Sequence, residues 1–272
     1  MLALGAALAW GFGDFGGGLS SRRAPVIGVV LVVQGLGALL MLVLAILRAD
    51  PAPASGTLGI AMACGVVGAG AILALYHGLA VGRMGVVAPL AAVLGASIPV
   101  IVGFVLLGPP SGSVVVGIGL GVVAVVLVSR VPAPAGRRSG IGWAITAGAL
   151  IGIFNVLVSR FPAGEVTWPL GMVRLTATIV VGLVALVGRR PWRVPRGALP
   201  LAGFVAVADV TGNALYIAAT HAGRLDVAAV VSSLFPVITV ILAILVLRER
   251  LTRSHAAGIA AAAGAVALIA AG

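Results

Sequence analysis

Residues 26–47 read VIGVVLVVQGLGALLMLVLAIL, an apolar run in which Gln34 is the only strongly polar side chain. A run of this length matches the roughly 20 helical residues that cross a hydrocarbon layer about 30 Å thick. Similar runs recur along the chain, separated by short loops rich in proline, glycine and arginine. The pattern predicts membrane-spanning helices rather than the core of a water-soluble domain.

The chain is expected to be an all-α integral membrane protein, because 61% of its residues are hydrophobic and only 8% are charged. No basic segment precedes the first apolar run, so a cleaved signal peptide is not expected. The weakest break between two predicted helices lies at residues 82–85, and one continuous long helix through this point is the competing interpretation. Hydropathy predicts ten transmembrane helices at residues 2–20, 26–47, 56–81, 84–107, 113–130, 140–160, 166–188, 197–220, 225–247 and 253–271.

The 17 basic residues are all arginines, and they are spread over the loops. Thirteen lie in the loops after odd-numbered predicted helices, three lie in the other loops, and Arg174 lies inside a helix. This spread, without a groove lined by aromatic residues, argues against a nucleic-acid partner. The positive-inside rule places the odd loops in the cytoplasm and both ends of the chain outside a multi-pass protein of the prokaryotic cytoplasmic membrane.

The sequence offers no cofactor site and no metal site. Cys64 is the only cysteine, and the three histidines include no pair with metal-ligand spacing. Residues 11–16 read GFGDFG and so fit the dinucleotide-binding pattern. That pattern needs a preceding strand and a βαβ unit, which an apolar helix does not provide.

The two halves of the chain resemble each other. Sliding residues 74–107 by 140 positions onto 214–247 gives ten identities in 34, including Ala-Leu-Tyr in both segments. Five helices per repeat force the halves into opposite membrane orientations, and inverted repeats of this kind enclose a solute site near the bilayer midplane. We therefore expect two inverted five-helix repeats around a central cavity, at residues 1–131 and 140–272, joined by a linker at 132–139.

Short motifs make the chain resemble an EamA-type member of the drug/metabolite transporter superfamily. They are Ala9-Trp10-Gly11, Val87-Ala88-Pro89-Leu90, Phe235-Pro236-Val237, Leu247-Arg248-Glu249-Arg250-Leu251, Gly258 and Arg174. The resemblance implies a ten-helix carrier of small solutes. Three features depart from the family: Gly108-Pro109-Pro110 stands where the second repeat has Arg248-Glu249-Arg250, Gln34 stands where arginine is frequent, and relatives mostly keep both termini in the cytoplasm.

Polar side chains inside apolar helices are the candidate functional residues, because each is costly in lipid unless solvated or paired. Asp14 and Asp209 fit a cavity or coupling role, and a structural hydrogen bond or ion pair is the alternative. Arg174 is a candidate counter-charge, and snorkelling to the interface is its alternative. Asp209, Asn213 and Tyr216 follow at i, i+4 and i+7, which places them on one helix face. This face is expected to line the central cavity, and hydrogen bonding between helices is the alternative.

The same cavity is predicted to extend to four further residues. Asn155 aligns approximately with Asp14 under the repeat shift, and Trp10, Tyr76 and His77 lie at suitable depths. For Tyr76 and His77, anchoring at the membrane interface is the alternative. The predicted cavity lining is therefore Trp10, Asp14, Tyr76, His77, Asn155, Arg174, Asp209, Asn213 and Tyr216.

The sequence predicts a secondary transporter that moves a small metabolite or drug-like solute by alternating access, and not an enzyme. Proton coupling through Asp14 or Asp209, exchange and facilitated diffusion all stay open, as do a monomer and a homodimer. The alternative is an intramembrane aspartyl protease, because residues 11–14 read GFGD and Asp209 could supply a second carboxylate. Val207-Ala208 precedes Asp209 where that protease family has tyrosine, which disfavours the alternative.

Overall fold

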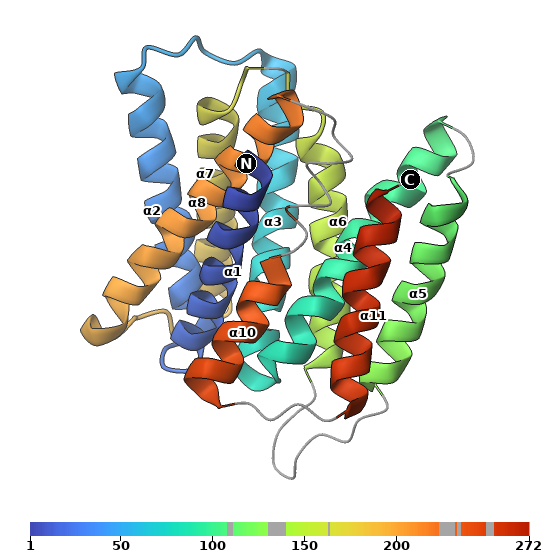
Figure 1. Cartoon of the computed structure of the whole chain (residues 1–272). Helices are drawn as coiled ribbons and strands as arrows, with labels where there is room; N and C mark the ends of the chain where they lie inside the picture. The colour runs from blue at the N-terminus through green and yellow to red at the C-terminus, as the bar shows by residue number, and fades with distance from the viewer. Residues whose placement is uncertain are drawn as a thin grey trace.

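The computed structural model describes residues 1–107, 111–129, 140–162, 164–222, 232, 235–248 and 253–271. In this part of the chain ten α-helices and one short 3-10 helix account for all regular structure (Figure 1). The helices are α1 (Leu2–Ser21), α2 (Val26–Leu47), α3 (Ser55–Val81), α4 (Met84–Leu107), α5 (Gly112–Ser129), α6 (Ile141–Val158), α7 (Thr167–Val187), η1 (Arg196–Ala198), α8 (Leu199–Ala222), α10 (Phe235–Leu247) and α11 (Arg253–Ala270).

The predicted helices agree with these bounds to within about two residues at most ends. The weak break at 82–85 is real, because α3 ends at Val81 and α4 begins at Met84. The predicted linker at 132–139 and the first part of the predicted helix 225–247 lie outside the described residues. The all-α fold class expected from the sequence is confirmed.

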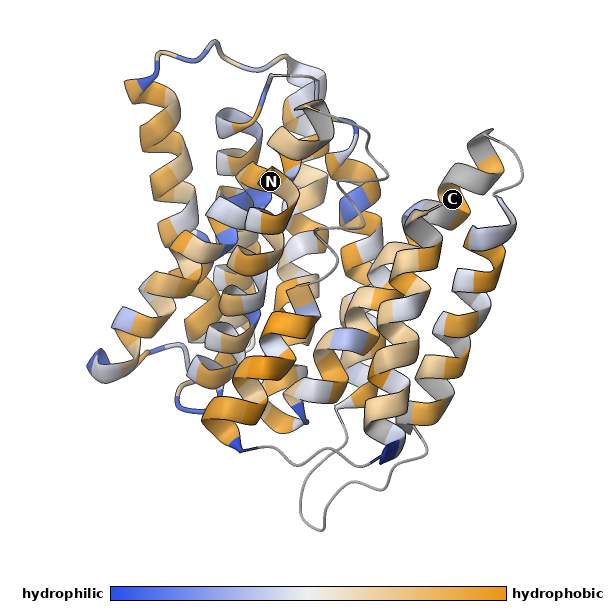
Figure 2. Ribbon diagram, viewed as in Figure 1, coloured by the Kyte–Doolittle hydropathy of each residue, from blue (hydrophilic) through white to orange (hydrophobic). Residues whose placement is uncertain are grey.

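Hydrophobic residues predominate along the helices of this bundle (Figure 2). Five helical segments are long and apolar enough to cross a membrane: α2, α3, α6, α7 and Arg196–Ala219, while α4, α5, α10 and α11 contain shorter apolar stretches. Large side chains such as Leu39, Ile46 and Leu186 are exposed on the outer faces. Exposed apolar surface on this scale fits contact with lipid rather than water.

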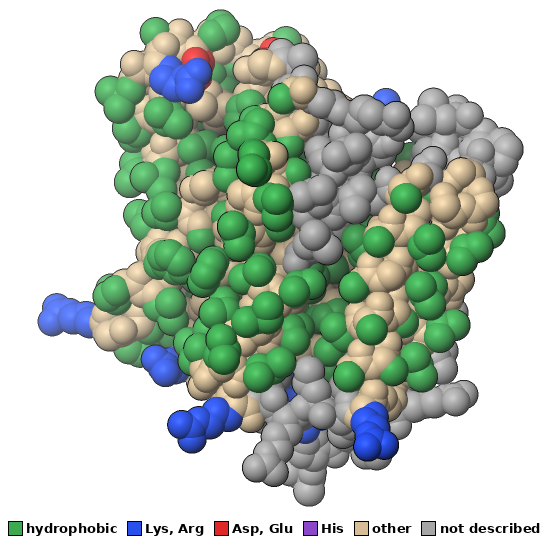
Figure 3. Space-filling model, viewed as in Figure 1, with side chains coloured by type: hydrophobic (Ala, Val, Ile, Leu, Met, Phe, Trp, Pro, Cys, Tyr) green, Lys and Arg blue, Asp and Glu red, His purple; other side chains and the backbone are tan. Residues whose placement is uncertain are grey.

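Contacts of described loops and helix ends group several of the odd-loop connections on one side of the bundle. The Arg22 guanidinium donates to the carbonyl of Gly82 at 3.1 Å, which ties the first loop to the third. Ser254 Oγ donates to the Leu127 carbonyl at 3.1 Å, and the backbone of Trp192 packs on Gly28. Most arginine side chains visible in Figure 3 lie along this lower face.

The loop before α3 and the start of α7 lie together at the opposite face. Thr167 Oγ1 donates to the Asp50 carboxylate at 2.5 Å, and Trp168 Nε1 donates to the Asp50 carbonyl at 3.0 Å. These bonds join the loop before α3 to the start of α7. For the described loops, the contacts therefore agree with the sidedness implied by the arginine count.

Most contacts between helices of different halves follow a two-fold exchange between the halves, although the α4–α11 contact has no comparable counterpart. If α1, α2, α3, α4 and α5 correspond to α6, α7, α8, α10 and α11, the contacts α1–α8 and α3–α6 exchange, as do α2–α8 and α3–α7, and α1–α10 and α4–α6. The pairs α2–α7, α4–α10 and α5–α11 map onto themselves. Because α2 and α7 run in opposite directions (Figure 1), the axis lies in the membrane plane, as inverted repeats require.

The same two-fold relation holds for contacts between single residues of the two halves. A Cβ on Gly11 of α1 would touch Phe235 of α10, and a Cβ on Gly95 of α4 would touch Ile151 of α6. Both members of the first contact are related to those of the second by 140 positions. This is the shift that aligned the two halves in sequence.

Candidate functional site

A buried ion pair lies where the two halves meet. Arg174 of α7 and Asp209 of α8 approach to 2.5 Å, with side chains 5% and 13% exposed. Arg174 Nη1 also donates to Gln34 Oε1 of α2 at 2.5 Å. Arg174 is thus the counter-charge of Asp209, and snorkelling to the interface, the alternative for this residue, is excluded by its burial.

Gln34 and Arg174 are 140 positions apart, so the shift that relates the repeats places one on the other. Their hydrogen bond joins α2 to α7, a helix pair that the two-fold exchange maps onto itself. The bond therefore lies close to the pseudo-two-fold axis. Sequence reasoning noted Gln34 only as a departure from the family and missed it as a site residue, although the repeat shift pointed to it.

Asp14 of α1 and Tyr76 of α3 complete the polar cluster. The Asp14 and Asp209 carboxyl groups lie close enough for their charges to interact, and Tyr76 lies within electrostatic reach of Asp14, Asp209 and Arg174. Tyr76 is 1% exposed, and its ring packs directly on the backbone of Gly17, where any Cβ would collide with it. Across the described residues, no side chain makes a hydrogen bond or ion pair to Asp14.

Aromatic side chains gather around Trp10, which lies one helical turn from Asp14. The Trp10 ring lies 5.4 Å from that of Tyr216 and 6.1 Å, edge-on, from that of Phe235. Trp10 packs on Gly212 of α8, where a side chain would occupy the place of the indole. Trp10 precedes Asp14 by four residues, so both lie on the same face of α1.

Asn213 lies between the ion pair and these rings. Its Nδ2 donates to the Asp209 carbonyl at 2.7 Å and to Asp209 Oδ1 at 3.2 Å. The predicted polar stripe of Asp209, Asn213 and Tyr216 is therefore one face of α8. Asn213 orients the Asp209 carboxylate from within its own helix rather than by bonding a neighbouring one.

Two predicted residues lie apart from this cluster. The His77 ring packs on Trp143 at 4.5 Å, on the α3–α6 side of the bundle. Asn155 lies half-buried in α6, and no contact described here joins its side chain to Asp14 or Arg174. The position in α6 that corresponds to Asp14 is Phe154, which packs on Gly68 of α3.

Sequence reasoning also missed the role of α10. Thr239 is fully buried, and its hydroxyl donates to the carbonyl of Gly11 at 3.2 Å, which fixes α10 against α1 beside the aromatic group. Phe235 stands at the first residue of the same helix. Both residues lie in an apolar run, where sequence hydropathy gives no sign of a site.

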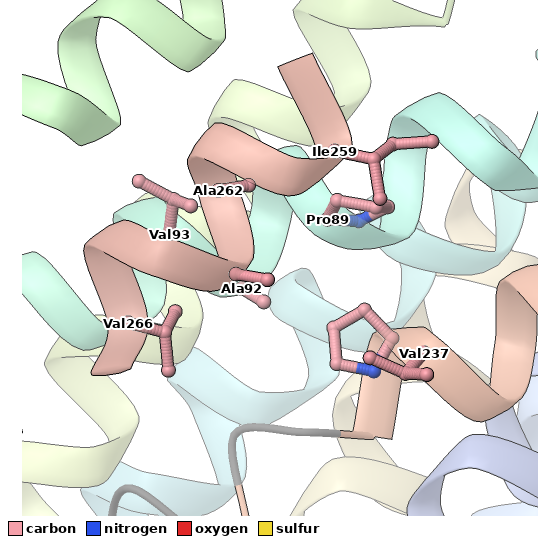
Figure 4. A pocket seen from close by; sticks show the side chains of 9 residues that line it. Pro89, Ala92, Val93, Val237, Ile259, Ala262 and Val266 are labelled. Carbon is pink, nitrogen blue, oxygen red and sulfur yellow. The ribbon is translucent and has the colours of Figure 1, made fainter. Parts of the chain in front are cut away.

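A separate small pocket lies between α4, α10 and α11 (Figure 4). Its lining is wholly apolar and includes Pro89, Ala92 and Val93 of α4, Pro236 and Val237 of α10, and Ile259, Ala262, Ala263 and Val266 of α11. None of the predicted site residues lines it. Among the described residues, no group of three or more His, Cys, Asp or Glu could hold a metal ion.

The comparisons with known proteins agree with this architecture. The model of the EamA-like transporter family matches residues 138–271. Thirteen chains of solved structures are similar; one, a crystal structure of a protein, shares 18% identity and a TM-score of 0.67, over 98% of this chain and 94% of that chain. At that identity the likeness concerns the fold alone, and the search of curated proteins finds no match. Over residues 138–271, nearly half of its length, the chain is therefore similar to the EamA-like transporter family, which is a family of membrane transporters.

Proposed function

We propose that this chain is a secondary transporter that moves a small metabolite or drug-like solute across the cytoplasmic membrane by alternating access. The observation that carries the proposal is the Arg174–Asp209 ion pair, held by Gln34 at the junction of the two halves. Ionic groups inside a lipid-embedded bundle are costly, and they mark solute and ion pathways. The junction of inverted repeats near the midplane is also where such carriers hold their solute.

The packing supports movement of one half against the other. Each half contributes helices to both polar and apolar contacts of the junction, with α1 on α8 and α3 on α6. Glycine backbones at the α1–α8 contact, as at Gly16 and Gly212, leave smooth surfaces along which helices can shift. Rocking about the in-plane axis would expose the polar cluster to one side of the membrane and then to the other.

Coupling to a proton gradient is part of the proposal. Asp209 is already neutralised by Arg174, whereas Asp14 has no described hydrogen-bonding partner. A carboxyl group without a counter-charge in a low-dielectric bundle is the group that takes up and releases a proton during a transport cycle. Exchange of one solute for another remains the alternative mode.

The protease alternative is disfavoured by the same geometry. Asp14 and Asp209 do lie within electrostatic reach of each other, as a catalytic pair must. An aspartyl dyad, however, shares one proton between two carboxyl groups. The Asp209 carboxylate is instead held by Arg174 and Asn213, so it is committed to other partners.

Transport by purified protein in proteoliposomes tests the proposal. A thermal-shift screen of metabolites first selects a solute, and its uptake is then measured with and without a pH gradient. We expect saturable uptake that Asp209→Asn largely abolishes, because that change discharges one partner of the ion pair. Asp50→Asn is the matched control, since its carboxylate lies in the loop before α3. Normal uptake by Asp209→Asn would contradict the role given to the ion pair, and uptake that does not respond to the gradient would rule out proton coupling.

A further inference from the structure

We infer that the site takes solutes of net charge +1, organic ammonium ions that carry a hydrogen-bond acceptor, and that the Asp14 carboxylate is their anchor. This inference rests on the proposed transport function and names the class of its solute. It is carried by the balance of charge in the cluster, by the aromatic rings beside Asp14, and by a donor of Arg174 that the protein leaves unused.

One carboxylate of the cluster has no counter-charge. Asp14, Asp209 and Arg174 are the charged side chains that the described helices bring together here, and Arg174 is matched by Asp209. An ionised Asp14 therefore gives the cluster a net charge of −1. In a lipid-embedded bundle such a charge calls for a cation or a proton at the same place. A solute of charge +1 restores neutrality, whereas an anion would double the imbalance.

Trp10 and the rings packed on it suit the ammonium end of that solute. Trp10 lies one helical turn from Asp14, and the Tyr216 and Phe235 rings lie 5.4 and 6.1 Å from the Trp10 ring. Tryptophan and tyrosine faces attract ammonium groups within about 6 Å of the ring centre, and the attraction is stronger when water is excluded. Trp10, Asp14 and Tyr216 are all partly accessible, in contrast to the fully buried Tyr76.

Arg174 is the reason for expecting a hydrogen-bond acceptor on the solute. Its Nε is buried without a hydrogen-bond partner, although its Nη1 serves both Asp209 and Gln34. A buried donor left unpaired costs about 1–3 kcal/mol. A hydroxyl or carbonyl oxygen on the solute would satisfy this donor without adding charge. An ammonium ion with one such oxygen thus meets Asp14, the rings and Arg174 together.

Equilibrium binding to the full-length protein in detergent tests the inference with probes matched in shape. Choline carries a quaternary ammonium and a hydroxyl, and 3,3-dimethylbutan-1-ol has the same shape without charge. Tyramine and 4-(2-hydroxyethyl)phenol form a second pair, and glycine betaine serves as a zwitterion of net charge zero. We expect at least one cation to bind about tenfold more tightly than its neutral counterpart, measured by calorimetry and by the shift in unfolding temperature.

Two variants assign that preference to Asp14. Asp14→Asn is expected to abolish the preference for the cation, and Asp50→Asn, a carboxylate variant outside the site, is expected to keep it. Should Asp14→Asn lose its fold, Trp10→Leu provides a second variant, with Trp143→Leu of α6 as its control. Trp10→Leu is expected to weaken binding of the cation, and Trp143→Leu is expected to leave it unchanged.

Three results would overturn the inference: neutral counterparts that bind as tightly as the cations, a preference for glycine betaine, or an unchanged preference in Asp14→Asn. None of them would remove the transport proposal, which is decided by uptake into proteoliposomes. Conversely, a cation that binds at Asp14 but is never transported would leave this binding site in place and refute the carrier function.

Discussion

The α1–α8 and α3–α6 contacts occupy equivalent places in the two-fold packing, but their chemistry differs. At α1–α8 the facing helices carry Trp10, Asp14, Asp209 and Asn213. The residues 140 positions away, which belong to α3–α6, are Leu150, Phe154, Ala69 and Leu73. Leu150 packs on Gly70 and Phe154 on Gly68, in an interface formed by apolar side chains and glycine backbone.

The comparison separates what the fold needs from what the site needs. Both interfaces bring helices into close contact through glycine, so close packing does not depend on the polar residues. Ala69 is fully buried where Asp209 stands in the other half, which shows that an apolar residue satisfies this position structurally. Because buried charges are costly in lipid, their presence in one interface alone indicates that one interface carries the function.

The largest effect is expected from Arg174→Leu, which makes α7 resemble an apolar helix and leaves Asp209 without a counter-charge. Removing one partner of a buried ion pair costs about 3–5 kcal/mol. We therefore expect a marked fall in the unfolding temperature of the detergent-solubilised protein and loss of transport. The double variant Arg174→Leu with Asp209→Leu should regain much of the stability but no transport. Equal stability of the single variant and the parent protein would mean that the ion pair is not buried as described.

Gln34→Leu tests the contact on the pseudo-two-fold axis. It removes the amide oxygen that accepts from Arg174 Nη1 and leaves the Asp209 contact intact. Hydrogen bonds to charged groups are worth about 1.5–3 kcal/mol, so we expect a smaller loss of stability than for Arg174→Leu. Unfolding of Gln34→Leu in the Arg174→Leu background provides the check, because the effect of the first change should vanish once the guanidinium is gone.

Gly17→Ala tests how tightly α1 is held against α3 beneath the cluster. A Cβ at this position would collide with the Tyr76 ring, which is fully enclosed. Forcing an extra methyl group into such a contact typically costs roughly 1–3 kcal/mol. The matched control is Gly59→Ala in α3, where nothing lies within 4 Å and the gain in helix propensity is up to about 1 kcal/mol. If both variants unfold at the parent temperature, the close contact between Gly17 and Tyr76 is wrong.

Much of the architecture could be predicted from the sequence, because lipid imposes a simple rule on helix length and composition. The run at 26–47 gave the bounds of α2 without error. The 140-residue shift predicted the inverted pairing, which reappears in the contacts of Gly11 with Phe235 and of Gly95 with Ile151. Both signals are local or periodic, and therefore survive in a single sequence.

The composition of the site was harder to predict, because it depends on which helix faces meet. The charges at Asp14, Arg174 and Asp209 were conspicuous in apolar helices, and the structure brings them together. His77 was equally conspicuous but packs on Trp143 on the α3–α6 side, since helix depth alone does not tell which neighbour a side chain meets. Gln34 was passed over because a lone amide in a long apolar run resembles many others, and only its partner reveals its role.

The last prediction concerns the orientation of the two faces and leaves stability unchanged. Arg189, Arg190, Arg193 and Arg196 lie exposed on the lower face together with the other odd loops, and the positive-inside rule places this face in the cytoplasm. In a Cys64→Ala background, Arg193→Cys should react with a membrane-impermeant maleimide only after the cells are permeabilised. Ala52→Cys, exposed between α2 and α3, should react in intact cells. The reverse pattern would mean that the chain keeps the orientation common among its relatives, so that the loop arginines do not decide how the bundle inserts.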